Sequence, residues 1–324
     1  MQEHLIGFDI GGTKCAVVIG KYDAARDELA VIGKRRYATA ECPAPLDCLE
    51  QLCRLAEELC AELSVGHDSL RGVGISCGGP LDARGGVILR PPNLPGWVNI
   101  PAAEIVSKRM GLPARLENDA NACAIAEWRF GAGRGTQNMV FLTFGTGMGG
   151  GIIANGQLLG GHTSLGGECG HIRIAPDGPV GFGKAGSFEG FCSGGGIGRV
   201  GRAYAREALA QGRSLAWCTS ESELDAVTAK SLAEAAFAGD PDARKIYADT
   251  GRRLGEGLSY LIDILNPECI VIGSVFARAE ALLRPTMEEA IAREAIPEAA
   301  AVCRVVPAKL GEAIGDIAAL SLMI

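Results

Sequence analysis

The stretch LIGFDIGGTKCAVVIG, residues 5–20, contains two apolar runs separated by a short polar segment with two glycines. Strand-forming residues lie on both sides of the interruption, so the stretch predicts a β-hairpin. The tip, residues 9–14, combines a carboxylate, two glycines, a hydroxyl and a cation. Glycine lets a ligand approach the backbone, and successive N–H groups bind anions, which makes the tip a candidate phosphate loop. An ordinary glycine turn between two core strands is the alternative.

The composition indicates a globular chain with a small-molecule partner. At 324 residues and 48% hydrophobic content, the chain can form about two domains with a substantial core. A net charge of -7 argues against a non-specific binder of nucleic acid or of anionic membranes. The twelve cysteines are scattered without a CxxC pair, which favours a reducing compartment. The chain has no export signal and no apolar run of about 18 residues, so we expect a cytoplasmic protein without a membrane segment.

Strand and helix patterns alternate along the chain, which is typical of the α/β class. After the hairpin, strands are predicted in AVIGKRRYAT, LRGVGIS, PARLEND, NMVFLTF, GIIA, QLLGG, CIVIG and VCRVVP. Helices are predicted at about 45–64, 119–130, 195–212, 241–265 and 278–294, and from about 312. A second strand–glycine–strand unit occurs at 138–154, so the second half of the chain repeats the opening pattern.

The second glycine loop, GTGMGG at 145–150, has the spacing of a dinucleotide fingerprint. That fingerprint requires a helix to begin at the glycines, whereas this chain continues as the hairpin pattern GGIIANGQLLGG. A nicotinamide enzyme is therefore disfavoured, and no GxxxxGK[ST] loop is present. Two loops remain, each able to present backbone N–H groups to phosphates.

Five motifs in order, DIGGTK, LENDANACAIAEW, GTGMGGGII, GGECGHI and NPECIVIG, give the chain a family likeness. From residue 5 onward it resembles the ROK family of sugar kinases and sugar-responsive repressors, which have the actin-like ATPase (ribonuclease H-like) fold. The resemblance implies a two-domain α/β protein with an inter-domain cleft, usually a homodimer. We expect an N-terminal domain at 1–118, a larger domain at 119–311, and a closing helix at 312–324 that packs on the first domain.

The resemblance also implies ATP, bound as its magnesium complex, and phosphoryl transfer to a hydroxyl of a hexose or N-acetylhexosamine. Asp9 is expected to bind magnesium, usually through water. The first phosphate loop would comprise Gly11, Gly12, Thr13 and Lys14, and the second would include Thr146 and Gly147. The adenosine end would lie at SGGGIG (193–198), which includes Gly195, and at Gly273 in VIGS.

For the sugar, the resemblance implies that Asp119 is the catalytic base. Sugar contacts are expected at Gly78, Gly79, Asn118, Glu168, His171 and Glu189, and Asn93 is a further candidate. A sugar hydroxyl is a poor nucleophile, and a carboxylate within hydrogen-bond reach can accept its proton. Each residue also has an ordinary alternative: a helix N-cap for Asp119, solvated carboxylates for the two glutamates, a satisfied polar residue for His171, and a turn residue for Asn93.

The chain departs from the family at a zinc motif of the form CxCGxxGCxE, which many members carry. The corresponding segment here is VGFGKAGSFE, with Val180, Phe182 and Ser187 in place of the three cysteines. Because His171 alone cannot form a tetrahedral site, we expect no structural zinc. We expect Val180 and Phe182 to form an apolar plug that replaces the metal.

Two further departures concern the nucleotide and DNA. Ser274 stands where a second glycine is common after Gly273. The repressor branch carries a winged-helix segment before the first loop, but only four residues precede Leu5, so we expect no nucleic-acid binding. The sequence therefore favours a sugar kinase, and a sugar-binding regulatory protein with little turnover is the alternative. The sequence leaves the identity of the sugar open.

Overall fold

The structure is a computed structural model that describes residues 2–324. It divides into two compact units. The first contains the described residues up to Gly135 together with Gly151–Gly167 and Lys309–Ile324, and the second contains Thr136–Gly150 and Glu168–Ala308. This grouping differs from the predicted division after residue 118, because α3 (Asp119–Phe130) lies with the first unit. There it packs against α10 (Ile314–Ser321) through small and branched apolar residues.

The first unit is built on a five-stranded sheet with the order β3-β2-β1-β4-β7. The strands are β1 (Gln2–Ile10), β2 (Lys14–Asp23), β3 (Glu28–Ala38), β4 (Leu70–Cys77) and β7 (Ala114–Asn118). β1 and β2 pair antiparallel up to Ile10 and Cys15, which confirms the predicted hairpin. β1, β4 and β7 run parallel, and Ile10, Cys77 and Asn118 align across them. The loops that follow these three strands therefore begin at one edge of the sheet.

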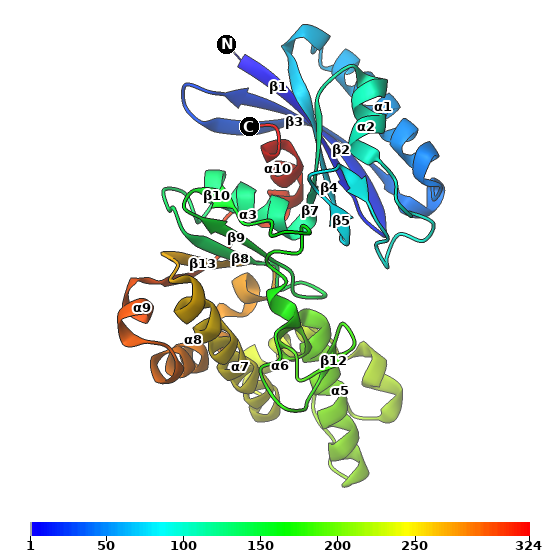
Figure 1. The fold of residues 1–324 in the computed structure, drawn as a ribbon. Coiled ribbons are helices and arrows are strands. Elements are labelled where there is room, and N and C mark those ends of the chain that lie inside the picture. Colours follow the sequence, from blue (N-terminus) through cyan, green and yellow to red (C-terminus); the bar gives the residue numbers. More distant parts are fainter. Residues whose placement is uncertain (1) are drawn as a thin grey trace. The chain divides into compact units, whose positions relative to one another are not determined.

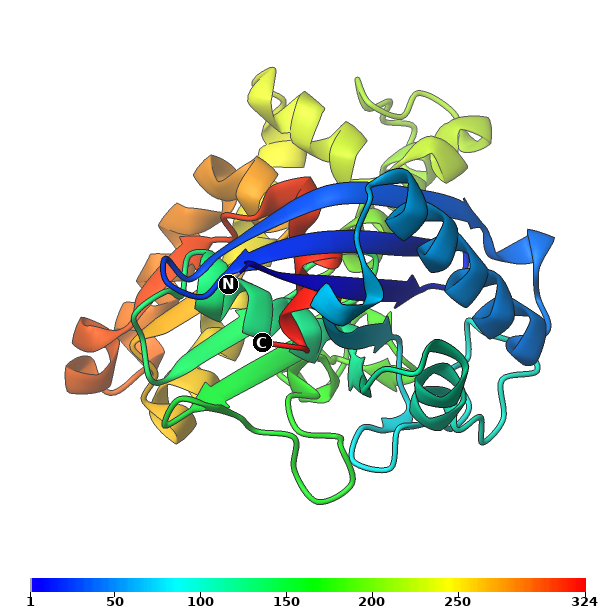
Figure 2. The ribbon, with the colours of Figure 1, turned by 90° about the horizontal axis from the view of Figure 1, so that it is seen from above.

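The two faces of this sheet are covered differently (Figure 1, Figure 2). α1 (Pro45–Glu62) and α2 (Ala102–Met110) lie on one face and share its core with alternate residues of the strands, such as Ile6 and Phe8. α10 covers the other face, where Leu320 meets Leu5 and Val18. α1 confirms the helix predicted at about 45–64, and its buried residues run from Cys48 to Cys60. α2 was not predicted.

Glycines bring α10 unusually close to the sheet. A Cβ atom on Gly74 would lie 1.9 Å from the carbonyl oxygen of Ala319, and one on Gly7 would lie 2.9 Å from the Cβ of the same alanine. On Gly20 it would lie 2.6 Å from a methyl group of Leu320. The helix backbone therefore rests on the strands at positions where any side chain would push it away.

A second five-stranded sheet has the order β10-β9-β8-β13-β14. Its strands are β8 (Met139–Leu142), β9 (Gly150–Ala154), β10 (Gln157–Leu158), β13 (Cys269–Ile272) and β14 (Arg304–Pro307). β13 is parallel to both β8 and β14. Each of these strands lies within or beside a predicted one. Short strand pairs are β5 (Leu81–Asp82) with β6 (Val87–Ile88), and β11 (Val180–Gly181) with β12 (Lys184–Ala185).

Helices make up much of the second unit. They are α4 (Phe188–Phe191), α5 (Gly194–Ala210), α6 (Ala229–Phe237), α7 (Pro241–Leu265), α8 (Val275–Glu294) and α9 (Pro297–Val302). The predicted helices at 195–212, 241–265 and 278–294 are confirmed, and α6 was not predicted. No helix within residues 2–324 is both long and apolar enough to cross a bilayer.

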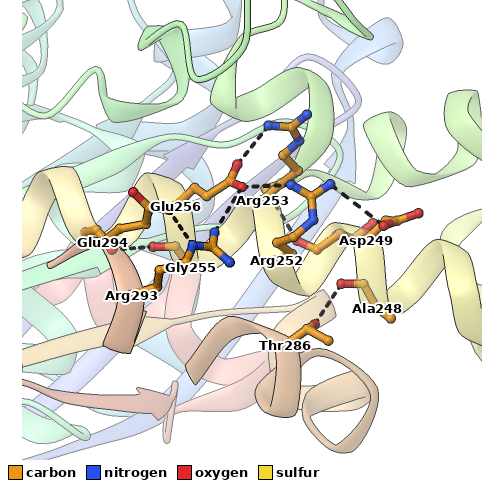
Figure 3. Close-up of polar contacts among 12 residues, drawn as sticks. Ala248, Asp249, Arg252, Arg253, Gly255, Glu256, Thr286, Arg293 and Glu294 are labelled. Carbon is orange, nitrogen blue, oxygen red and sulfur yellow. Dashed lines mark hydrogen bonds and ion pairs between the residues drawn. The ribbon is translucent and has the colours of Figure 1, made fainter. Parts of the chain in front are cut away.

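α7 and α8 pack closely, again through glycines. A Cβ atom on Gly255 of α7 would lie 2.3 Å from the carbonyl oxygen of Met287 in α8. Figure 3 shows the polar contacts along these helices, including Thr286, which donates to the carbonyl oxygen of Ala248 (2.7 Å). Glu256 accepts hydrogen bonds from Arg252 (2.7 Å) and Arg253 (2.8 Å), so one carboxylate joins two turns of α7.

Candidate active site

The first glycine loop, residues 11–13 followed by Lys14 at the start of β2, joins β1 to β2 and is fixed by a buried threonine. Thr39 donates from Oγ1 to the carbonyl oxygen of Gly11 (2.6 Å) and from its N–H to that of Thr13 (3.0 Å). The N–H of Gly11 donates back to the carbonyl oxygen of Lys14 (3.0 Å). Gly12 and Thr13 are exposed, and their N–H groups have no partner among residues 2–324. These two N–H groups are available to an anion.

Asp9 is the last residue but one of β1, close to this loop, and is half-buried. Burial, together with the nearby carboxylates of Asp119 and Asp316, raises the pKa of Asp9 to about 7. Lys34, paired with Asp316 at 2.6 Å, opposes the shift. Three carboxylates with one ammonium group favour an additional cation.

The donor set fits magnesium, which is commonly bound by one or two carboxylates together with substrate phosphates and water. In the described part of the chain, no group of three or more His, Cys, Asp or Glu side chains is placed to hold a metal ion. A magnesium ion would therefore bind to Asp9 with most of its ligands supplied by the phosphates and by water.

The junction of β7 and α3 positions Asp119. Asn118 is the N-cap of α3, because its Oδ1 accepts from the N–H groups of Ala120 (2.9 Å) and Asn121 (3.3 Å). Asp119 is the first helical residue, so the N-cap alternative for it is wrong. Its Oδ1 accepts from Ala120 (2.9 Å). The surrounding protein reduces the hydration of Asp119 and raises the pKa of its carboxyl group, while the residue keeps surface open to solvent.

Other predicted residues of the first unit gather around this junction. A Cβ atom on Gly78, directly after β4, would lie 3.7 Å from the side-chain amide of Asn93 and 4.0 Å from Oδ2 of Asp119. On Gly79 it would lie 3.3 Å from Nδ2 of Asn118, and on Gly12 it would lie 2.4 Å from the carbonyl oxygen of Asn93. The segment around Asn93 thus contacts both the first glycine loop and the glycine turn after β4.

In the second unit, the N-terminus of α5 supports the second glycine loop. Gly194 donates to the carbonyl oxygen of Gly145 (2.7 Å), and Gly195 donates to that of Thr146 (3.1 Å). The N–H of Gly195 is therefore engaged by the loop. Gly273, directly after β13, lies close to the strand that leads into the same loop, since its Cβ would be 3.1 Å from the carbonyl oxygen of Thr143.

Glu168, His171 and Glu189 come from two neighbouring segments of this unit. Glu168 and His171 are exposed, and the N–H of His171 donates to the carbonyl oxygen of Glu168 (3.1 Å). Glu189 is half-buried, and its Oε2 accepts from the N–H of Met148 in the second glycine loop (3.0 Å). Gly170 packs against Glu189, with a Cβ position 3.4 Å from the glutamate's Cβ.

The predicted apolar plug is wrong. Phe182 is 75% exposed and Val180 is 50% exposed. The Phe182 ring lies edge-on to the ring of His171, with the two ring centroids 6.2 Å apart. The buried residue is Ser187, whose Oγ donates to the carbonyl oxygen of Gly181 (3.3 Å) and accepts from the N–H of Gly190 (3.1 Å). The loop is therefore held by hydrogen bonds between a buried serine and the backbone, while the two large apolar side chains lie exposed.

Sequence reasoning missed a second layer of residues behind the site. Glu117 accepts from the N–H of Asn118 (2.9 Å) and from Nδ2 of Asn121 (3.0 Å). Asn121 is buried, and its Oδ1 has no hydrogen-bond partner within the described residues. The signal was the polar run in LENDAN, which interrupts an otherwise apolar strand and helix.

Comparison with known proteins gives the chain its family. The ROK family model matches residues 5–324. A glucokinase from Thermotoga maritima is 33% identical, with 98% of this chain and 96% of the relative covered. An N-acetylmannosamine kinase from Salmonella typhi is 31% identical, with 86% and 85% covered. A solved structure of a ROK family glucokinase from Streptomyces griseus, in complex with glucose and AMPPNP, is 32% identical over 98% of both chains with a TM-score of 0.74.

These matches confirm the predicted family and fold class, since they span almost the whole chain and include a solved structure with the same mixed α/β architecture. The chain belongs to the ROK family and has the actin-like ATPase fold.

Proposed function

We propose that this protein is an ATP-dependent sugar kinase that phosphorylates a hydroxyl of a hexose or an N-acetylhexosamine. The observation that carries the proposal is the position of Asp119. Its carboxylate lies at the edge of the first sheet where three strands end together, near Gly78 and Asp9, and its pKa is raised. A raised pKa suits a group that must accept a proton during the reaction.

Each set of residues has a separate role in this reaction. Asp119 orients the sugar hydroxyl and accepts its proton as transfer proceeds. Sugar contacts come from Gly78, Gly79, Asn93, Asn118, Glu168, His171 and Glu189. The first loop, with Gly11, Gly12, Thr13 and Lys14, and the second, with Thr146 and Gly147, bind the phosphates of ATP. Gly195 and Gly273 lie on the adenosine side.

Magnesium bound with ATP supplies positive charge against the transferring phosphoryl group, where most of the acceleration in such reactions arises. Asp9 would hold that ion, usually through water. We infer that the protein needs no structural zinc. We also infer that it acts in the cytoplasm as a homodimer, without binding nucleic acid or membranes.

Glucose is the first sugar to test, because the Thermotoga maritima relative is a glucokinase and the Streptomyces griseus structure contains glucose. The N-acetylmannosamine kinase relative makes N-acetylhexosamines the second group.

The test is ADP formation from ATP and magnesium with a panel of hexoses and N-acetylhexosamines. We expect one sugar to stimulate ADP release strongly and to appear as its phosphate. If no sugar stimulates turnover while one raises the melting temperature, the protein is a sugar-binding regulator and the kinase proposal fails.

A further inference from the structure

We propose that Glu189 is a positioning residue that fixes the second glycine loop for the nucleotide with one carboxylate oxygen and receives a sugar hydroxyl with the other. This inference rests on the proposed function. It goes further by assigning to one side chain the energetic coupling between sugar and nucleotide binding.

The contact with the loop is direct. Oε2 of Glu189 accepts the N–H of Met148 at 3.0 Å. A Cβ atom on Gly147 would lie 2.7 Å from the same oxygen, so the carboxylate lies against the loop backbone at a position that only glycine leaves open. A hydrogen bond from a backbone N–H to a carboxylate is among the stronger kinds in proteins. The conformation of this part of the loop therefore depends on where the carboxylate is.

The carboxylate is itself positioned by its neighbours. Ser187 caps α4 by accepting from the N–H of Gly190 (3.1 Å), which fixes the turn that carries Glu189. A Cβ atom on Gly181 would lie 3.0 Å from the Cβ of Glu189. One on Gly170 would lie 3.4 Å from that Cβ and 2.1 Å from the carbonyl oxygen of Met148. The segment that carries Glu168 and His171 thus packs against both ends of the contact.

Two sets of contacts support the second glycine loop, and only one of them involves a proposed sugar ligand. The N-terminus of α5 holds the carbonyl oxygens of Gly145 and Thr146, independently of any substrate. Glu189 holds Met148, and its Oε1 has no hydrogen-bond partner within residues 2–324. A sugar hydroxyl that donates to Oε1 would restrict the carboxylate and, through it, the loop. The nucleotide would then bind to a loop that is already ordered, so sugar binding strengthens nucleotide binding.

The test measures the dissociation constants of glucose and of a non-hydrolysable ATP analogue with magnesium, each alone and in the presence of the other. Where another sugar of the panel is the substrate, it replaces glucose. The variants are Glu189→Ala, Glu189→Gln and, as a matched control, His171→Ala. His171 belongs to the same proposed sugar set, but its ring contacts Phe182, and within residues 2–324 it makes no hydrogen bond to the second glycine loop.

We expect Glu189→Ala to weaken analogue binding about tenfold in the absence of sugar, because a hydrogen bond to a charged acceptor is lost. Glu189→Gln should restore it, since the carboxamide oxygen can accept from Met148. Its NH₂ group then faces the sugar, so sugar affinity and the coupling remain low. His171→Ala should weaken sugar binding alone.

If Glu189→Ala binds the ATP analogue in the absence of sugar as tightly as the wild type does, the inference is overturned. Glu189 would then contact the sugar alone. If that variant does not fold, Glu189→Gln decides: retained analogue affinity with lost coupling supports the inference, and lost analogue affinity overturns it. A wild-type protein that binds no analogue contradicts the proposed function itself.

Discussion

At the scale of single residues, the site contains some groups that stabilise the folded protein and others that destabilise it. Asn118 caps α3 and Thr39 fixes the first loop, and both interactions satisfy backbone groups. Asp119 has a raised pKa, which means that the folded protein disfavours its ionised form. Groups that are unfavourable for folding and well placed for chemistry are expected at active sites.

Asp119→Asn should therefore separate activity from stability. We expect turnover to fall by roughly 10²- to 10⁴-fold, because the proton acceptor is removed. The melting temperature at neutral pH should stay equal or rise, since the ionised carboxylate is unfavourable there. Sugar-stimulated ADP release and thermal unfolding measure the two effects. Unchanged turnover would remove Asp119 as the base.

The same shift predicts the acidic side of the pH profile. A base must be ionised, so kcat/KM should decline as the pH falls through the pKa of Asp119. Because burial raises that pKa, the decline should begin above the value of about 3.9 typical of a free aspartate. Circular dichroism over the same pH range separates titration from unfolding. A profile that stays flat down to pH 4 in the folded protein contradicts the assignment.

Thr39→Val tests the support of the first loop. The substitution keeps the side-chain shape and removes the hydrogen bond to the carbonyl oxygen of Gly11, which should cost about 0.5–1.5 kcal/mol of stability. The KM for ATP should rise by roughly 2- to 10-fold, with a smaller effect on the KM for sugar. Thr39→Ser retains a hydroxyl and should behave like the wild type. Equal changes in both KM values would indicate a general loss of structure.

At the scale of elements, the sequence predicted the helices and strands whose apolar residues follow a clear pattern. The helix α1 and the strand β1 were predicted because the first has apolar residues at helical spacing and the second is a short run of large apolar residues. α2 and α6 were missed because each has nine residues and only three buried ones, several of them alanine. The exposure of Phe182 could not be predicted, since loop contacts follow backbone geometry and not residue type.

Gly255→Ala tests the packing of α7 on α8. Alanine favours a helix by about 1 kcal/mol over glycine, but a Cβ here would meet the carbonyl oxygen of Met287 at 2.3 Å. Overpacking typically costs about 1–3 kcal/mol, so we expect a lower melting temperature. In Gly198→Ala of α5, the nearest atom is Nη1 of Arg202 at 3.3 Å, the end of a long side chain that donates to the carbonyl oxygen of Val227 (2.7 Å), so stability should fall less than in Gly255→Ala. A stable Gly255→Ala would show that the helices can separate without cost.

At the scale of the whole molecule, local patterns predicted the α/β class and the order of the elements, and the motifs predicted the family. Local patterns do not encode which distant segments share a core. Gly151–Gly167 and Lys309–Ile324 join the first unit through contacts that no periodicity predicts. The glycines beneath α10 were not recognised as its packing partners, because a glycine within a strand has many possible causes.

The packing of α10 on Gly7, Gly20 and Gly74 has a consequence for synthesis on the ribosome. The strands of the first sheet are translated early, but the helix that covers one of their faces is made only after Glu168–Ala308. Until then, Leu5 and Val18 lack the cover that Leu320 gives them. Domains usually fold from the N-terminus onward as they emerge. Here, the unit whose strands are translated first is completed last, so one apolar face of its sheet stays uncovered until the final residues of the chain are made.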